Sequence, residues 1–132
     1  MITGPYPGII ELLRELKKHN IKMGIATNKV KSAADKLNEI YFEGLIDEVA
    51  GVEDGIIPKP DRCMIDNLMK RLNATTDETL YVGDSQVDVA TARNTGLDMV
   101  AVLWGFRTRK ELEESGAMVF IDDPMEILDK VL

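Results

Sequence analysis

The sequence is poor in residues that serve several common kinds of protein chemistry. Among its 132 residues there is one cysteine (Cys63), one histidine (His19) and one tryptophan. A single cysteine excludes a disulfide within the chain and fits a reducing compartment. The histidine stands at the end of a predicted helix, where a role at the helix dipole is simpler than catalysis. No serine or cysteine has a histidine partner, so the sequence offers no nucleophile of that kind.

Long apolar runs and an excess of positive charge are also missing. No apolar stretch approaches the roughly 18 residues that a membrane-spanning helix needs, and no signal-peptide pattern opens the chain, so we expect a cytoplasmic protein without a membrane partner. The net charge of −7 argues against a nucleic-acid partner. With 45% hydrophobic and 30% charged residues, the composition is that of a single globular domain, which we assign to residues 1–132.

Short apolar strands alternate with amphipathic helices along the whole chain. We expect strands over 21–26, 47–52, 79–82, 98–103 and 118–121, and helices over 9–20, 30–41, 64–72, 86–94, 108–116 and 124–132. Thr108 and Glu111 have the spacing of a capping box, and Gly96 is placed to end a helix. The alternation predicts an α/β fold with a mostly parallel sheet, helices on both faces and right-handed crossovers.

Residues 80–90 are the most informative stretch. An apolar strand runs to Gly83 and is followed at once by Asp84, as in open α/β sheets that place an acid at the carboxyl end of a buried strand. Asp88 stands four residues later, so both carboxylates share one face of the next helical turn. A divalent cation such as Mg²⁺ would relieve their repulsion. The alternative is that both acids only complement the dipole of a helix N-terminus.

Polar residues follow two other predicted strands and should reach the same edge of the sheet. Thr27 and Asn28 come after the first strand, and Lys59 lies in the Gly-Ile-Ile-Pro-Lys-Pro loop after the second. A hydroxyl, an ammonium and paired carboxylates are the groups that phosphate chemistry needs. Taken singly, Thr27 or Asn28 could cap the following helix, and Lys59 could be an exposed loop lysine.

On these motifs the chain resembles the haloacid dehalogenase superfamily of phosphohydrolases, and within it the phosphoglycolate-phosphatase-like branch. The resemblance covers nearly the whole chain and rests on Tyr6-Pro7-Gly8, Thr27-Asn28-Lys29, Lys59-Pro60, Gly83-Asp84-Ser85-Gln86-Val87-Asp88 with Ala92 and Gly96, Trp104-Gly105-Phe106, and Asp122-Asp123-Pro124.

The resemblance also implies roles for individual residues. Thr27 and Lys59 would be catalytic, and together with Asn28 they would bind the phosphate of a small phosphorylated metabolite. Asp84 would bind Mg²⁺, and Asp88 would either support the metal or orient Lys59. The implied fold is a three-layer, Rossmann-like core.

One part of the family pattern has no match. The first motif, Asp-x-Asp-x-Thr, supplies the nucleophile at the end of the central strand, and neither it nor a cap domain is found in the sequence. We therefore expect a core truncated of its first strand. Because an unfilled gap would leave backbone groups unpaired at about 1–3 kcal/mol for each buried group, we expect the strands over 21–26 and 79–82 to pair directly, or a strand to be exchanged between chains in a homo-oligomer.

These observations lead to two hypotheses for the function. The first is a Mg²⁺-dependent phosphate monoester hydrolase core that is inactive as an isolated chain because the nucleophilic aspartate is absent. The second is a non-catalytic module that keeps the phosphate and metal pocket. A signalling receiver domain uses similar residue types, but its acceptor acid lies on an earlier strand than its threonine, whereas here Thr27 comes first. The resemblance implies that a cap domain selects the substrate.

Overall fold

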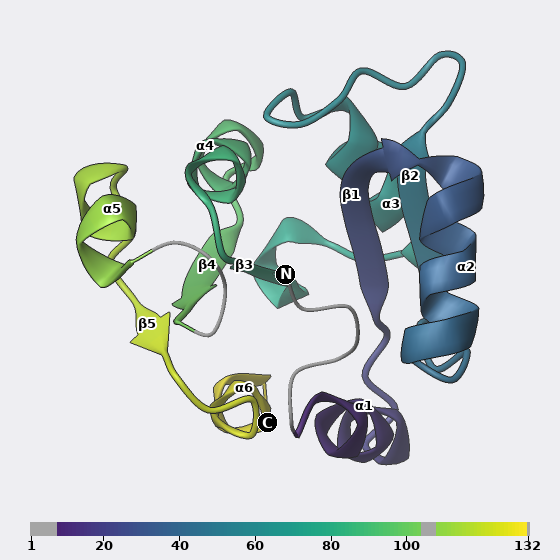
Figure 1. Cartoon of the computed structure of the whole chain (residues 1–132), viewed down its shortest axis with the longest axis horizontal. Helices are drawn as coiled ribbons and strands as arrows, with labels where there is room; N and C mark the ends of the chain where they lie inside the picture. Colours follow the sequence, from purple (N-terminus) through teal and green to yellow (C-terminus); the bar gives the residue numbers. More distant parts are fainter. Residues whose placement is uncertain (1–7, 104–107, 132) are drawn as a thin grey trace.

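The computed structural model describes residues 8–103 and 108–131 and has an α/β architecture (Figure 1). Its helices are α1 (Ile9–Lys18), α2 (Lys31–Tyr41), α3 (Cys63–Leu72), α4 (Gln86–Thr95), α5 (Arg109–Glu114) and α6 (Glu126–Val131), with a 3₁₀ turn at Thr76–Glu78. Its strands are β1 (Gly24–Val30), β2 (Glu48–Val52), β3 (Leu80–Gly83), β4 (Asp98–Val102) and β5 (Phe120–Ile121).

The predicted order of helices and strands is confirmed. The capping box of Thr108 and Glu111 begins α5, and Gly96 follows α4 in the left-handed conformation (φ 75°). The main difference is β1, which begins three residues later than predicted and continues to Val30. The motifs at Tyr6-Pro7 and Trp104-Gly105-Phe106 lie outside the described residues.

All strand pairs are parallel, but they form two sheets. β1 pairs with β2, and β3, β4 and β5 form a second sheet in that order. Figure 1 shows the first pair on the right beside α2 and the second sheet on the left beside α4 and α5. No ladder joins β1 to β3 in the part of the chain that the structure describes. The prediction that these two strands pair directly is therefore wrong.

Side-chain packing joins the two sheets instead of backbone hydrogen bonds. Ala26 of β1 packs against a cluster that contains Tyr81 of β3, and Met23, just before β1, lies in the same core as residues of β4 and β5. The unpaired backbone groups of β1 and β3 cost less free energy than fully buried groups would, because the facing edges of these two strands are partly exposed. Gly24 is exposed, and Val82 keeps 41% of its surface accessible, so water reaches both sides.

Helices cover both faces of each sheet, which confirms the three-layer arrangement. Leu13 of α1 and Ile127 of α6 pack on one face of the second sheet, and Val89 of α4 and Leu112 of α5 pack on the other. In β2, Ala50 packs against α3, whereas the neighbouring Gly51 faces the start of α2. α1 and α6 are in contact and lie together at the bottom of Figure 1.

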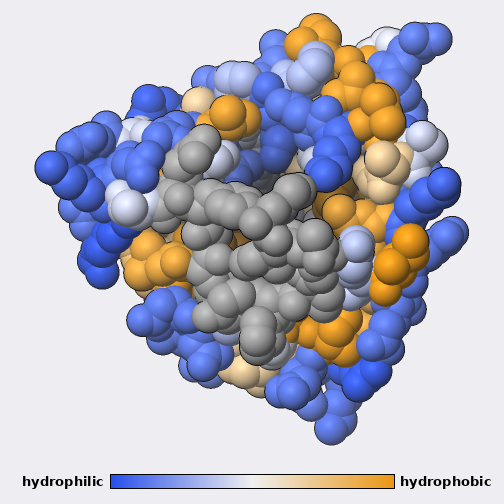
Figure 2. All heavy atoms as spheres, viewed as in Figure 1, coloured by the Kyte–Doolittle hydropathy of each residue, from blue (hydrophilic) through white to orange (hydrophobic). Residues whose placement is uncertain are grey.

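The surface of the molecule is mainly polar, as expected from the 30% of charged residues in the sequence. The outer parts of the face drawn in Figure 2 are largely hydrophilic, with smaller apolar patches between them. None of the helices in the described ranges is both long and apolar enough to cross a membrane.

Two methionines provide a matched test of where the core lies. Met64 is fully buried (0% exposed), whereas Met118 is 90% exposed. Met64→Ala should lower the free energy of unfolding by about 2–5 kcal/mol, because it leaves a cavity in the core. Met118→Ala should change it by less than about 0.5 kcal/mol. Urea denaturation measures both changes, and similar losses at the two positions would contradict this description of the core.

Candidate functional site

The pairing of β1 with β2 is irregular near the end of β1, and two of the predicted site residues, Thr27 and Asn28, lie in this irregular part. Ala26 lies opposite Ala50 and Val30 opposite Val52, so residues 27–29 of β1 face the single residue 51 of β2. Bulges of this kind redirect side chains and are common beside active sites. Thr27 and Asn28 thus lie within β1, and no side chain caps the following helix, whose N-cap is Val30. The capping alternative for these residues is wrong.

Asn28 fixes the loop that carries Lys59. Its Oδ1 accepts a hydrogen bond from the Lys59 backbone N–H (2.9 Å), and its Nδ2 donates to the Lys59 carbonyl (3.0 Å). The next carbonyl, that of Pro60, accepts a hydrogen bond from Nδ2 of Asn94 in α4 (2.8 Å). The loop is therefore tied to both β1 and α4. That Asn28 also contacts phosphate stays a prediction.

A Ser-x-x-Asp pattern holds Asp88 at the start of α4. Ser85 is the N-cap, and its Oγ accepts from the Asp88 N–H (3.3 Å) and donates to Asp88 Oδ2 (3.1 Å). The Asp84 backbone N–H donates to the same carboxylate oxygen (3.0 Å). The side chain is thus folded back onto the end of β3. Gly83 makes room for it, since a Cβ there would lie 2.4 Å from the Cβ of Asp88.

Lys59 is part of a largely buried polar cluster and is not an exposed loop lysine. Its Nζ lies 3.0 Å from Asp88 Oδ1, and only 11% of either side chain is exposed. The buried hydroxyl of Tyr81 donates to the same oxygen (2.8 Å) and lies 3.5 Å from Lys59 Nζ. The structure therefore brings Asn28, Lys59, Asp84 and Asp88 to one edge of the molecule, with Thr27 next to Asn28 on the bulge.

The two carboxyl groups titrate differently because their surroundings differ. Burial alone would raise the pKa of Asp88, but the Lys59 charge and hydrogen bonds from Lys59 and Tyr81 hold it below its usual range. Burial and the neighbouring charge of Asp88 raise the pKa of Asp84. Burial raises the pKa of the Tyr81 hydroxyl, and the charge of Asp88 raises it further. The hydroxyl therefore stays protonated and able to donate a hydrogen bond.

The charges of the cluster fit a bound cation. One ammonium, from Lys59, faces two carboxylates, so negative charge is in excess in a partly buried place. Within residues 8–103 and 108–131, no group of three or more Asp, Glu, His or Cys side chains could hold a metal. Mg²⁺ does not need such a group, because it commonly takes one or two carboxylates and completes its shell with water and phosphate oxygens.

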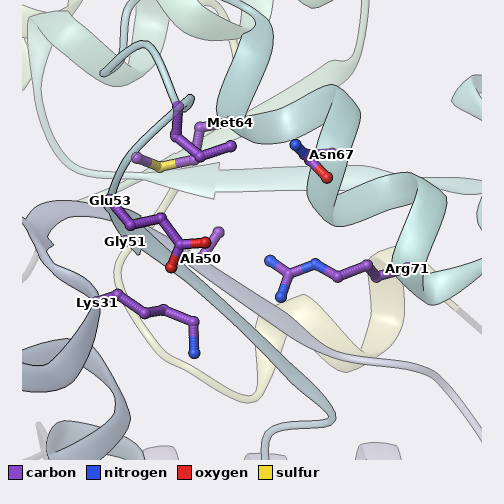
Figure 3. Close-up of a pocket in the computed structure, with 8 residues that line it drawn as sticks. Lys31, Ala50, Gly51, Glu53, Met64, Asn67 and Arg71 are labelled. Carbon is purple, nitrogen blue, oxygen red and sulfur yellow. The ribbon is translucent and has the colours of Figure 1, made fainter.

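A separate hollow, of about 110 Å³, lies at β2 and contains none of the predicted site residues (Figure 3). Its polar lining includes Lys31, Glu53, Asn67 and Arg71. The two cations there already have partners, since Lys31 Nζ binds Asp35 (2.6 Å) and Arg71 donates to the Val49 carbonyl (3.2 Å). We assign no function to this hollow.

Three contributors to the cluster were not identified from the sequence. Tyr81 lies in an apolar run, so the sequence indicates only a strand residue there. The hydrogen bond from Asn94 to the Lys59 loop joins residues 34 positions apart, and no local pattern indicates it. Ser85 did give a signal, because Ser-x-x-Asp before a helix is a capping pattern.

Gly83→Ala tests the contact between β3 and the Asp88 side chain. The added Cβ would force Asp88 away from its donors, so we expect a loss of about 1–3 kcal/mol in the free energy of unfolding. Gly24→Ala is the control, because its Cβ would meet only leucine side-chain ends at 3.0 Å. Equal, small losses in urea denaturation would show that Asp88 is not held as described.

Asp84→Asn tests the raised pKa of Asp84. A raised pKa means that ionisation costs the folded state free energy, and this cost is complete above the folded pKa. The variant should therefore be more stable than the wild type at pH 7 without metal. Its advantage should disappear as the pH is lowered through the folded pKa to the unfolded value of about 3.9. Thermal unfolding at several pH values measures this, and a variant less stable at pH 7 would contradict it.

Comparison of the sequence with known proteins agrees with the family resemblance. The family model for haloacid dehalogenase-like hydrolases matches residues 2–102. The chain is 36% identical over 121 residues to a phosphoglycolate phosphatase of Rhodospirillum rubrum, covering 89% of this chain and 49% of the relative. It is 30% identical over 126 residues to a pyrophosphatase of Bacillus mycoides, covering 93% of this chain and 58% of that protein.

Comparison of the structure with solved structures points to the same family. A crystal structure from Lactobacillus delbrueckii subsp. bulgaricus, assigned as a phosphoglycolate phosphatase, superposes with a TM-score of 0.94 at 36% identity, covering all of this chain and 56% of the other. The chain thus spans about half the length of the curated relatives it matches. Since the family model covers most of its residues, the chain belongs to the haloacid dehalogenase-like hydrolases.

Proposed function

We propose that this chain supplies the phosphate-binding and Mg²⁺-binding part of a phosphate monoester hydrolase of the phosphoglycolate-phosphatase type. We further propose that it hydrolyses phosphate esters slowly or not at all by itself, since no Asp-x-Asp-x-Thr motif occurs in its 132 residues. The observation that carries the proposal is the Lys59–Asp88 contact of 3.0 Å, which joins the loop after β2 to the first turn of α4 beside Asp84.

Each group has a task that its surroundings favour. The ammonium of Lys59 would neutralise charge on a phosphoryl group, and the Thr27 hydroxyl would donate to one of its oxygens. Asp84 would hold Mg²⁺, whose charge would offset the excess negative charge of the cluster and of a phosphoryl group. Asp88, whose two oxygens already accept hydrogen bonds from four donors, would orient Lys59.

The names of the relatives support the class of substrate but not its identity. One relative is a phosphoglycolate phosphatase and another a pyrophosphatase, and both names denote the hydrolysis of a phosphate ester or anhydride. We therefore propose a small phosphorylated metabolite as the substrate of the complete enzyme, and phosphoglycolate as the first compound to test.

Binding and turnover should be measured on the same purified chain. We expect Mg²⁺ with inorganic phosphate to raise the midpoint of thermal unfolding, and we expect no turnover of a generic aryl phosphate above the buffer rate. Asp84→Asn should remove the Mg²⁺ effect, and Lys59→Met should remove the phosphate effect, because each variant deletes one of the proposed ligands. Asp129→Asn, an exposed acid in α6, serves as the control.

The possible results distinguish the hydrolase hypothesis from the hypothesis of a non-catalytic module. Binding without turnover supports the proposal. Mg²⁺-dependent turnover that Asp84→Asn abolishes would show a complete enzyme and overturn the proposed inactivity, along with the alternative of a non-catalytic module. No binding of either ion would overturn the assignment of the site.

We also propose that a strand from a second chain completes the sheet. β1 and β3 each have a partner on one side only among the described strands, and unpaired edges of parallel strands are ready to accept another strand. Sedimentation velocity over a range of concentrations should show a dimer or larger assembly that dissociates on dilution. A monomer at all concentrations would contradict strand exchange between copies of this chain.

A further inference from the structure

We propose that Tyr81 is a positioning residue that sets where the Lys59 ammonium can lie, both through the Asp88 carboxylate and through the 3.5 Å hydrogen bond that Lys59 Nζ donates to the Tyr81 hydroxyl oxygen. This inference rests on the proposed function, because it takes Lys59 as the group that meets phosphate. Tyr81 belongs to β3, whereas Lys59 belongs to a loop 22 residues earlier in the chain.

Each oxygen of the Asp88 carboxylate accepts hydrogen bonds from two donors. Oδ2 is held by the Asp84 N–H and the Ser85 hydroxyl, which fixes the plane and rotation of the carboxylate. Oδ1 has two donors, the Tyr81 hydroxyl at 2.8 Å and Lys59 Nζ at 3.0 Å. An oxygen of this kind has two lone pairs. Because Tyr81 occupies one of them, Lys59 is confined to the other.

The position of Tyr81 makes this constraint rigid. The residue is 9% exposed, and its ring packs with Ile65, Ala92 and Leu97 between β3 and the helices. The hydroxyl therefore approaches Asp88 from the core, while Lys59 approaches from the loop. Without the hydroxyl, Lys59 or water could take either lone pair, and the ammonium would no longer have a single position facing the phosphate.

Tyr81→Phe removes the hydroxyl and keeps the packed ring. Tyr41→Phe is the matched control, because Tyr41 lies at the end of α2 and is 36% exposed. The first readout is the ¹⁵N NMR signal of the Lys59 ammonium, assigned by its loss in Lys59→Met. We expect hydrogen exchange of this ammonium to become at least about tenfold faster in Tyr81→Phe, with the backbone amide spectrum otherwise retained.

The second readout is the affinity for inorganic phosphate in the presence of Mg²⁺. Loss of one positioning hydrogen bond should weaken phosphate binding about three- to tenfold, while Mg²⁺ affinity stays within about twofold because Asp84 is untouched. A change in both the ammonium signal and phosphate affinity supports the inference.

Other results have distinct meanings. An unchanged ammonium signal in Tyr81→Phe overturns the inference, and so does a changed signal with unchanged phosphate affinity. If the wild-type chain binds no phosphate, the proposed function fails. The ammonium signal then still decides whether Tyr81 positions Lys59.

Discussion

The largely buried ion pair between Lys59 and Asp88 is the contact on which the proposed site depends. An ion pair taken out of water is not stabilising by itself, because desolvation offsets much of the attraction. Here the cost is reduced, since each Asp88 oxygen also accepts a hydrogen bond from a neutral donor fixed by β3 or the start of α4. The pair links the two sheets at a point where no backbone ladder joins them in the described chain.

The surroundings of this pair are arranged to keep it in one geometry. Gly83 lets the Asp88 side chain lie directly against β3, and Ser85 caps α4 while holding the same carboxylate. On the other side, Asn28 binds both backbone polar groups of Lys59. Backbone bonds therefore place the loop, and side-chain bonds place the ammonium. Asp84 is left beside the pair, where burial and the neighbouring charge of Asp88 raise the pKa of its carboxyl.

The sequence was sufficient for features that follow from local patterns and from the rule that parallel strands end at one edge. The order of elements, the placement of Asp84 after β3 and the convergence of Lys59 with the two carboxylates at one edge could all be predicted in this way, whereas the contact between Lys59 and Asp88 was only one of two options that the family resemblance implied. Long-range hydrogen bonds could not, because nothing near Asn28 or Asn94 shows that each binds the loop of Lys59. Direct pairing of β1 with β3 was wrong because the cost of the gap depends on solvent access at Gly24 and Val82, which only the structure shows.

The most direct test of the central contact is a double-mutant cycle for the free energy of unfolding with Lys59→Met and Asp88→Asn. If the two side chains form the pair described here, the effects should be non-additive, with a coupling of about 1–3 kcal/mol. Effects that add within about 0.5 kcal/mol would mean that Lys59 and Asp88 do not interact in solution. The proposed phosphate and metal site would then lose its geometric basis.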